Sequence, residues 1–114
     1  MDLITEIFRL NDELTASIKK LADNGKRLAE AERDYKLTLR EEALKLRTEK
    51  DMPVTLINNI IYGVPKVADL RFKRDVAEAV YTANQEHINL TKLKIRILDN
   101  QVSREFGVAG KNGF

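Results

Sequence analysis

Few residues in this sequence could carry out catalysis. His87 is the only histidine and there is no cysteine, which excludes thiol nucleophiles, disulfides and thiolate metal sites. His87 precedes Ile88, an apolar position of a helical repeat, and no nucleophile motif accompanies it. A di-iron bundle would need Glu-x-x-His on facing helices, which one histidine cannot supply. The sequence therefore predicts a protein that is not an enzyme and holds no cofactor or metal.

The acidic residues are better explained as surface ion pairs than as general acids or metal ligands. Glu30 and Asp34 alternate with basic residues such as Arg27 at spacings of three and four, which place side chains next to each other on a helix. Residues 23–25 resemble a fragment of a calcium loop, but the other ligands of such a loop are missing. Residues 107–113 resemble a phosphate loop only in glycine spacing.

The residues with the clearest binding chemistry lie in and around the segment 52–65, which contains Pro53 and ends at Pro65. One interpretation is that its bulky apolar residues fold back and close the end of a helical hairpin. These residues are Leu56, Ile57, Ile60 and Ile61. The other interpretation is that the segment also forms a basic tip, which would suit a phosphate backbone or an acidic protein groove. The residues of this tip are Lys45, Arg47, Lys50, Asn58, Asn59, Tyr62, Lys66, Arg71 and Lys73.

A long helix must position the first part of this tip. Apolar residues recur every three or four positions from residue 4 to residue 46, and the phase is the same before and after residues 23–25. This favours one helix over about residues 3–50, because a glycine inside a helix costs only about 1 kcal/mol relative to alanine. The alternative is two helices with Gly25 as the cap between them. The predicted inward-facing residues are Ile4, Ile7, Asn11, Leu14, Ile18, Leu21, Gly25, Leu28, Glu32, Tyr35, Leu39, Glu42 and Leu46.

A short helix and a second long helix are predicted after Pro53. Pro53 ends the first helix, because the residue before a proline is disfavoured in the α conformation. Thr55 can cap a short helix over 56–62 that ends at Gly63, and Pro65 suits the first turn of the next helix. The predicted inward-facing residues of that helix are Val67, Leu70, Arg74, Ala77, Tyr81, Asn84, Ile88, Thr91, Ile95, Leu98, Val102 and Glu105.

Two long amphipathic helices joined by a short segment must turn back on each other to bury their apolar stripes. The predicted fold is therefore all-α, a long antiparallel helical hairpin, coiled-coil-like, with a short helix at the bend. We expect a single domain over residues 1–106 and a flexible C-terminal tail over residues 107–114, where three of the five glycines lie.

The repeats also predict how the two helices are aligned. Matching them from the bend outward places Tyr35 beside Tyr81 and brings Glu42 opposite Arg74, within reach of a salt bridge. The second helix carries further apolar residues off its main stripe, and a long additional stripe usually packs against another subunit. We therefore expect a homo-oligomer, most simply a dimer with four helices. The residues of this oligomer face are Phe72, Val76, Val80, Leu90, Leu93 and Ile97.

The composition and the N-terminus favour a folded, soluble protein. The chain is 43% hydrophobic and 33% charged, as is usual for globular proteins. Asp2 and Glu6 occupy positions where a secretory signal would carry basic residues before an apolar run, and no apolar stretch reaches membrane-spanning length. We expect a cytoplasmic protein with no membrane partner.

Several stretches resemble a group of small prophage-encoded proteins of Gram-positive bacteria. The resemblance covers about residues 28–106, and its stretches are 31–36, 44–50, 53–57, 67–72 and 74–78. It implies a role near recombination and single-strand-binding functions, and small phage proteins also include inhibitors of host defence such as anti-CRISPR proteins. We expect a non-enzymatic phage-type binding protein acting on nucleic-acid-handling machinery, through a protein partner or by direct contact with nucleic acid. It would be a replication or recombination accessory, or an inhibitor of a defence nuclease. The alternative is an oligomeric helical adaptor with no nucleic-acid role.

Overall fold

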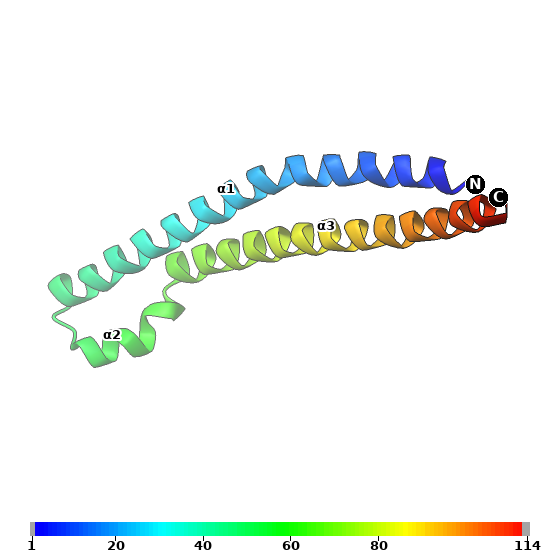
Figure 1. Cartoon of the computed structure of the whole chain (residues 1–114). Helices are drawn as coiled ribbons and strands as arrows, with labels where there is room; N and C mark the ends of the chain where they lie inside the picture. Colours follow the sequence, from blue (N-terminus) through cyan, green and yellow to red (C-terminus); the bar gives the residue numbers. More distant parts are fainter. Residues whose placement is uncertain (1, 113–114) are drawn as a thin grey trace. The chain divides into compact units, whose positions relative to one another are not determined.

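The computed structural model describes residues 2–112, with side chains for 2–107, and all of its regular secondary structure within them is helical. Its elements are α1 (Leu3–Glu49), α2 (Val54–Ile60), the 3-10 turn η1 (Ile61–Gly63) and α3 (Pro65–Asn112) (Figure 1). The two long helices pack against each other with the short helix between them in the chain, which confirms the predicted helical hairpin.

The hairpin divides into two compact units, each with a part of α1 and a part of α3. Unit 1 comprises residues 1–22 and 82–114, and unit 2 comprises residues 23–81, including α2. The single domain expected over residues 1–106 stays a prediction.

The N-terminus of α1 is capped by Asp2. One carboxylate oxygen accepts a hydrogen bond from the backbone N–H of Ile4 at 2.8 Å, and the other accepts one from the hydroxyl of Thr5 at 2.9 Å. The Thr5 bond, followed by the Ile4 bond, lowers the pKa of Asp2, because both favour the ionised carboxylate. The ionised cap satisfies backbone donors that the first turn of a helix leaves without partners.

α1 runs through Gly25 without interruption, which confirms one continuous first helix. Gly25 faces Tyr81 of α3, and a Cβ atom added at this position would lie 3.4 Å from Cε2 of that ring. This is an ordinary van der Waals distance, so the close packing does not require glycine here.

Replacing Gly25 by alanine is therefore expected to stabilise the protein by about 1 kcal/mol, because alanine has the higher helix propensity and fits beside Tyr81. Urea unfolding followed by circular dichroism measures the change. Ala22→Gly, which makes the opposite change at an exposed position of the same helix, is the matched comparison and should destabilise by a similar amount. Destabilisation by Gly25→Ala would mean that the Tyr81 ring does not accommodate the added methyl group.

The first helix ends about where predicted, but the cap of the short helix differs from the prediction. α1 ends at Glu49, and Asp51 turns the chain with a left-handed φ of 48°, a conformation that aspartate tolerates better than most residues. The cap predicted at Thr55 is wrong, because α2 already begins at Val54, preceded by Pro53 with extended backbone and without a side-chain cap.

α3 begins at Pro65, as predicted, and continues to Asn112, beyond the end expected near residue 107. Two of the three C-terminal glycines lie within this helix, since each costs only about 1 kcal/mol. The flexibility expected for 107–114 stays a prediction, and residues 113–114 lie outside the described residues.

The inward-facing stripe is correct for α3 and partly wrong for α1. On α3 each predicted position is buried or half-buried except Glu105, which is exposed. On α1 the stripe holds from residue 21 onward, but Ile4, Asn11 and Ile18 are exposed and Leu10 and Ser17 are buried instead. An α-helix has 3.6 residues per turn, so its inward face drifts by about 20° for each seven-residue repeat.

The predicted alignment of the two helices is also wrong. Tyr81 lies against Gly25, about three helical turns before Tyr35, its predicted partner. Tyr35 instead lies beneath Arg74, whose guanidinium carbon is 4.6 Å from the ring centroid. The salt bridge between Glu42 and Arg74 does not form.

The carboxylate of Glu42 is 3.5 Å from the amine of Lys45, and the guanidinium of Arg74 is 2.7 Å from the carboxylate of Asp75. The Asp75 hydrogen bond raises the pKa of Arg74, because it favours the charged form.

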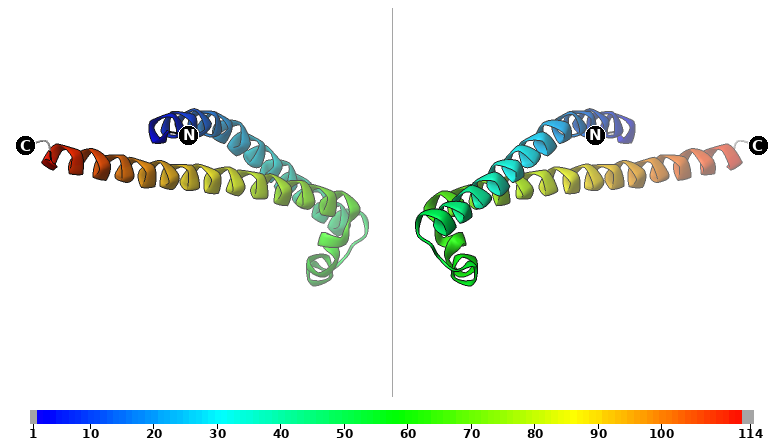
Figure 2. Two further views of the ribbon diagram at one scale, coloured as in Figure 1. Left: turned by 90° about the vertical axis from the view of Figure 1, so that its right-hand side faces the viewer. Right: turned by 90° about the vertical axis from the view of Figure 1, so that its left-hand side faces the viewer.

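The physical reason for the shifted alignment is that α2 takes the place of α3 beside the end of α1. α2 folds back beside the last turns of α1 (Figures 1 and 2), and its buried residues Ile57 and Ile61 pack in one cluster with Tyr35 and Val67. The partly buried residues around this cluster include Ala43 and Leu46 of α1. The start of α3 therefore lies against an earlier part of α1 than a compact bend would give.

Candidate partner-binding site at α2

The apolar residues of α2 and η1 divide between the core and the surface. Ile57 and Ile61 are 5% and 4% exposed, whereas Leu56 and Ile60 are 45% and 39% exposed. The prediction that all four close the end of the hairpin is therefore correct for the first pair and wrong for the second. Each exposed residue directly precedes a buried one, and neighbouring residues on a helix point about 100° apart, so one member of each pair faces the core and the other faces solvent.

The exposed side of this segment has no charge and carries four large hydrophobic side chains beside polar ones. Val54 and Tyr62 are exposed there in addition to Leu56 and Ile60, and Asn58 and Asn59 are exposed between them. No charged residue occurs between Met52 and Pro65, although a third of the whole chain is charged. The segment therefore has no charged side chain on its exposed side or on its buried side.

Two arginines from the neighbouring helices contact the segment directly. Nη1 of Arg47 donates a hydrogen bond to the backbone carbonyl of Met52 at 3.0 Å. The guanidinium carbon of Arg71 lies 5.1 Å from the centroid of the Tyr62 ring, within cation–π range. The structure thus brings Arg47, Tyr62 and Arg71 of the predicted tip to the two ends of the segment.

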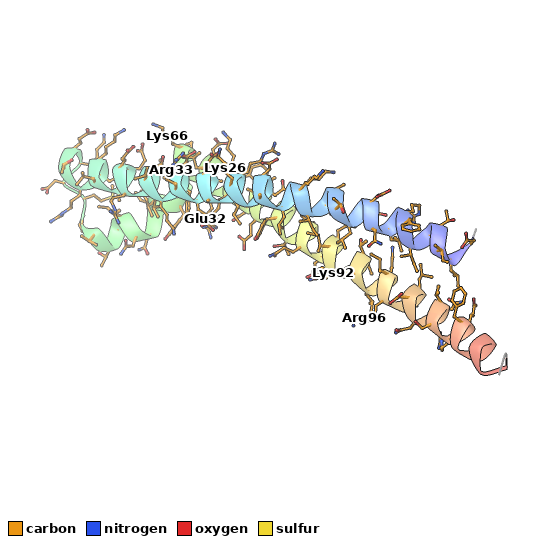
Figure 3. All side chains as sticks on the ribbon, turned by 45° about the horizontal axis from the view of Figure 1, so that its top comes forward. Lys26, Glu32, Arg33, Lys66, Lys92 and Arg96 are labelled. Atoms are coloured by element: carbon orange, nitrogen blue, oxygen red, sulfur yellow. The ribbon has the colours of Figure 1, made fainter. Side chains whose placement is uncertain are left out.

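The remaining basic residues of the tip differ in their partners. Lys45 and Lys73 are paired along their own helices, with Glu42 at 3.5 Å and with Asp69 at 3.2 Å. Lys66 points away from the ribbon at the start of α3 (Figure 3). Among the described side chains, the basic groups that have no carboxylate within 4.0 Å include Arg47, Lys50, Lys66 and Arg71.

This end of the hairpin is the basic part of the chain. Residues 36–75 contain nine basic and six acidic side chains, a net charge of +3. The whole chain has a net charge of +2, so the residues outside this range are net negative by one charge. An anionic partner would therefore be attracted to the α2 end in preference to the rest of the surface.

The six residues of the predicted oligomer face are all exposed. Phe72, Val76 and Val80 follow one another at four-residue spacing in unit 2, and they are 66%, 47% and 47% exposed. A groove of about 230 Å³ beside them is lined by Val76, Val80 and four further residues of α1 and α3. Those four residues are Asn24, Arg27, Lys73 and Ala77.

In unit 1 the corresponding residues are Leu90, Leu93 and Ile97, which are also exposed. A groove of about 330 Å³ lies beside Ile97, with Leu10 and Leu98 among its lining residues. Each unit therefore exposes apolar side chains of α3 that the α1–α3 contact does not use.

The remaining surface offers ordinary polar contacts between side chains. Nε2 of His87 lies 3.1 Å from a carboxylate oxygen of Glu13, which links α3 to α1 in unit 1. The described residues contain no group of three or more histidine, aspartate or glutamate side chains that could hold a metal ion. Within the same part of the chain, none of the helices combines the length and the apolar character needed to cross a membrane.

Comparison of the chain with protein-family models, curated proteins and solved structures finds no match. The function must therefore be inferred from the surfaces described above.

Proposed function

We propose that this chain is a non-enzymatic binding protein that self-associates through α3 and presents the α2 end to a partner. The observation that carries the proposal is the imbalance between a small core and a large apolar surface. Among the described side chains, six hydrophobic ones are buried, whereas sixteen large hydrophobic ones are exposed. Monomeric soluble proteins rarely expose apolar side chains in such continuous rows.

The composition of the oligomer face supports a second copy as the partner of α3. All six of its residues are aliphatic or aromatic and exposed. Homodimer interfaces are more apolar than the rest of a protein surface, so these residues suit such an interface.

Sedimentation equilibrium tests self-association directly. We expect a dimer at micromolar concentration, and we expect Val76→Glu with Val80→Glu to raise the dimer Kd at least about 100-fold, because each change places a charge in the apolar contact. Leu90→Glu with Leu93→Glu tests the residues of unit 1 in the same way. The matched control is Leu37→Glu with Leu44→Glu, two exposed apolar residues of α1, which should leave the Kd nearly unchanged. A wild-type chain that stays monomeric at all concentrations would refute the proposal.

A second candidate function is action on nucleic-acid-handling machinery, as a replication or recombination accessory or as an inhibitor of a defence nuclease such as an anti-CRISPR protein. The observation that favours it is the net charge of +3 over residues 36–75. A basic end is suited to a groove that normally holds nucleic acid or to an acidic protein surface. The resemblance to prophage-encoded proteins supports the same candidate.

A further inference from the structure

We propose that the exposed side of α2 and η1 is a docking site for an amphipathic helix of a partner protein, with acidic residues along the edge of its apolar stripe. The site comprises Val54, Leu56, Ile60 and Tyr62, with basic side chains beside it. This inference rests on the proposed binding function and names the chemistry of its partner.

The apolar part of the partner is indicated by the exposed side chains. Leu56 and Ile60 are one helical turn apart, so they form a short ridge on the solvent side of α2. Ile57 and Ile61, which directly follow the two ridge residues in the chain, pack in the core, and this packing keeps the ridge at the surface. A ridge of two aliphatic residues can pack between residues of a second helix at i and i+4.

The acidic part of the partner is indicated by the charges at both ends of the segment. Arg47 is held by its hydrogen bond to the Met52 carbonyl and Arg71 by its contact with Tyr62. Neither arginine, nor Lys50 or Lys66, has a carboxylate within 4.0 Å among the described side chains. Glu49 and Asp51 lie at the start of the segment, so the excess of positive charge is largest at its end, around Lys66 and Arg71.

Two other anionic partners fit these observations less well. Nucleic acid would use the cations, but aliphatic side chains offer nothing to phosphates, and one ring face of Tyr62, the segment's single aromatic residue, is already covered by Arg71. An anionic membrane would need side chains that project far from the surface. Leu56 and Ile60 are less than half exposed, which suits a fitted protein surface better than insertion into lipid.

The test uses the full chain and a synthetic 18-residue amphipathic peptide, with leucines at i, i+3, i+4 and i+7 and glutamates beside them. Fluorescence anisotropy of the labelled peptide is expected to show saturable binding with a Kd of about 10 μM. The same peptide with lysines in place of the glutamates should bind at least about tenfold more weakly. A dT20 oligonucleotide and vesicles of phosphatidylcholine with phosphatidylserine are the competing probes.

Two sets of variants locate the binding. Leu56→Ser with Ile60→Ser, and separately Lys50→Glu with Lys66→Glu, should each weaken binding of the acidic peptide at least about tenfold. The matched control is Lys19→Glu with Lys20→Glu, two exposed lysines in unit 1, which alters the net charge equally and should have little effect. Circular dichroism confirms that the variants remain folded.

Tighter binding of dT20 or of the vesicles, equal binding of the two peptides, or equal losses from the site and control variants would overturn the inference. Absence of peptide binding would overturn it as well. Sedimentation equilibrium of the same variants separates this outcome from failure of the proposed function, because self-association through α3 does not involve α2.

Discussion

Replacing Val67 by aspartate is expected to destabilise unit 2 by about 3–5 kcal/mol, which is the cost of burying a charge without a partner. Val67 has no exposed surface, and it packs in one cluster with Tyr35, Ile57 and Ile61. Small domains are stable by only about 5–15 kcal/mol, so this one change removes a large part of the total. Urea unfolding at fixed protein concentration, followed by circular dichroism, measures the loss.

Two further variants show whether burial is the cause. Val67→Ala should cost about 2 kcal/mol, because it removes two buried methyl groups without adding a charge. Ala68→Asp places the same carboxylate one residue later at an exposed position in the first turns of α3, where its effect should stay below about 1 kcal/mol. Equal destabilisation by Val67→Asp and Ala68→Asp would contradict the observed burial of Val67.

The inward face of α3 could be predicted because its residues follow the seven-residue repeat closely. From Val67 to Val102 each predicted position is buried or half-buried. In α1 a better signal was available at a spacing of about 18 residues. This is five full turns, after which a side chain points in the same direction again. Leu10, Leu28 and Leu46 have this spacing, and the first of them is one of the two buried residues that the seven-residue repeat missed.

The alignment of the two long helices could not be predicted from their repeats alone. A repeat shows which face of a helix is inward but not which turn of the partner it meets, since a shift by one repeat preserves the pattern. The actual alignment depends on how Ile57 and Ile61 pack between the end of α1 and Val67. That packing depends on where α2 begins and on the left-handed turn at Asp51, which the residue types in this segment do not determine.

The composition of the candidate site was predictable, but its contacts were not. The concentration of basic residues around 53–65 is visible in the sequence. The division of this segment into an exposed apolar ridge and a buried side depends on where α2 begins, which is Val54. The stacking of Arg71 on Tyr62 is a contact across a chain turn of irregular geometry, for which no spacing rule exists.

The second large effect is expected at Tyr35. Tyr35→Ala should destabilise the protein by about 3–4 kcal/mol, because it leaves a cavity of aromatic size in the unit 2 cluster. Tyr35 is 6% exposed, packs with Ile57, Ile61 and Val67, and carries the guanidinium of Arg74 over its ring. Urea unfolding measures this loss, and Tyr35→Phe, which keeps the ring and its packing, should cost less than about 1 kcal/mol.

A double-mutant cycle between Tyr35 and Arg74 tests the observed helix alignment independently of the cavity. Tyr35→Leu removes the aromatic ring and Arg74→Gln removes the cation, so the cycle should give a coupling of about 0.5–1 kcal/mol for the stacked pair. The same cycle between Glu42 and Arg74 should give almost none, because Arg74 pairs with Asp75 instead. A strong coupling between Glu42 and Arg74 with none between Tyr35 and Arg74 would mean that α3 lies farther along α1 in solution, with Ile57 and Ile61 no longer packed against Tyr35.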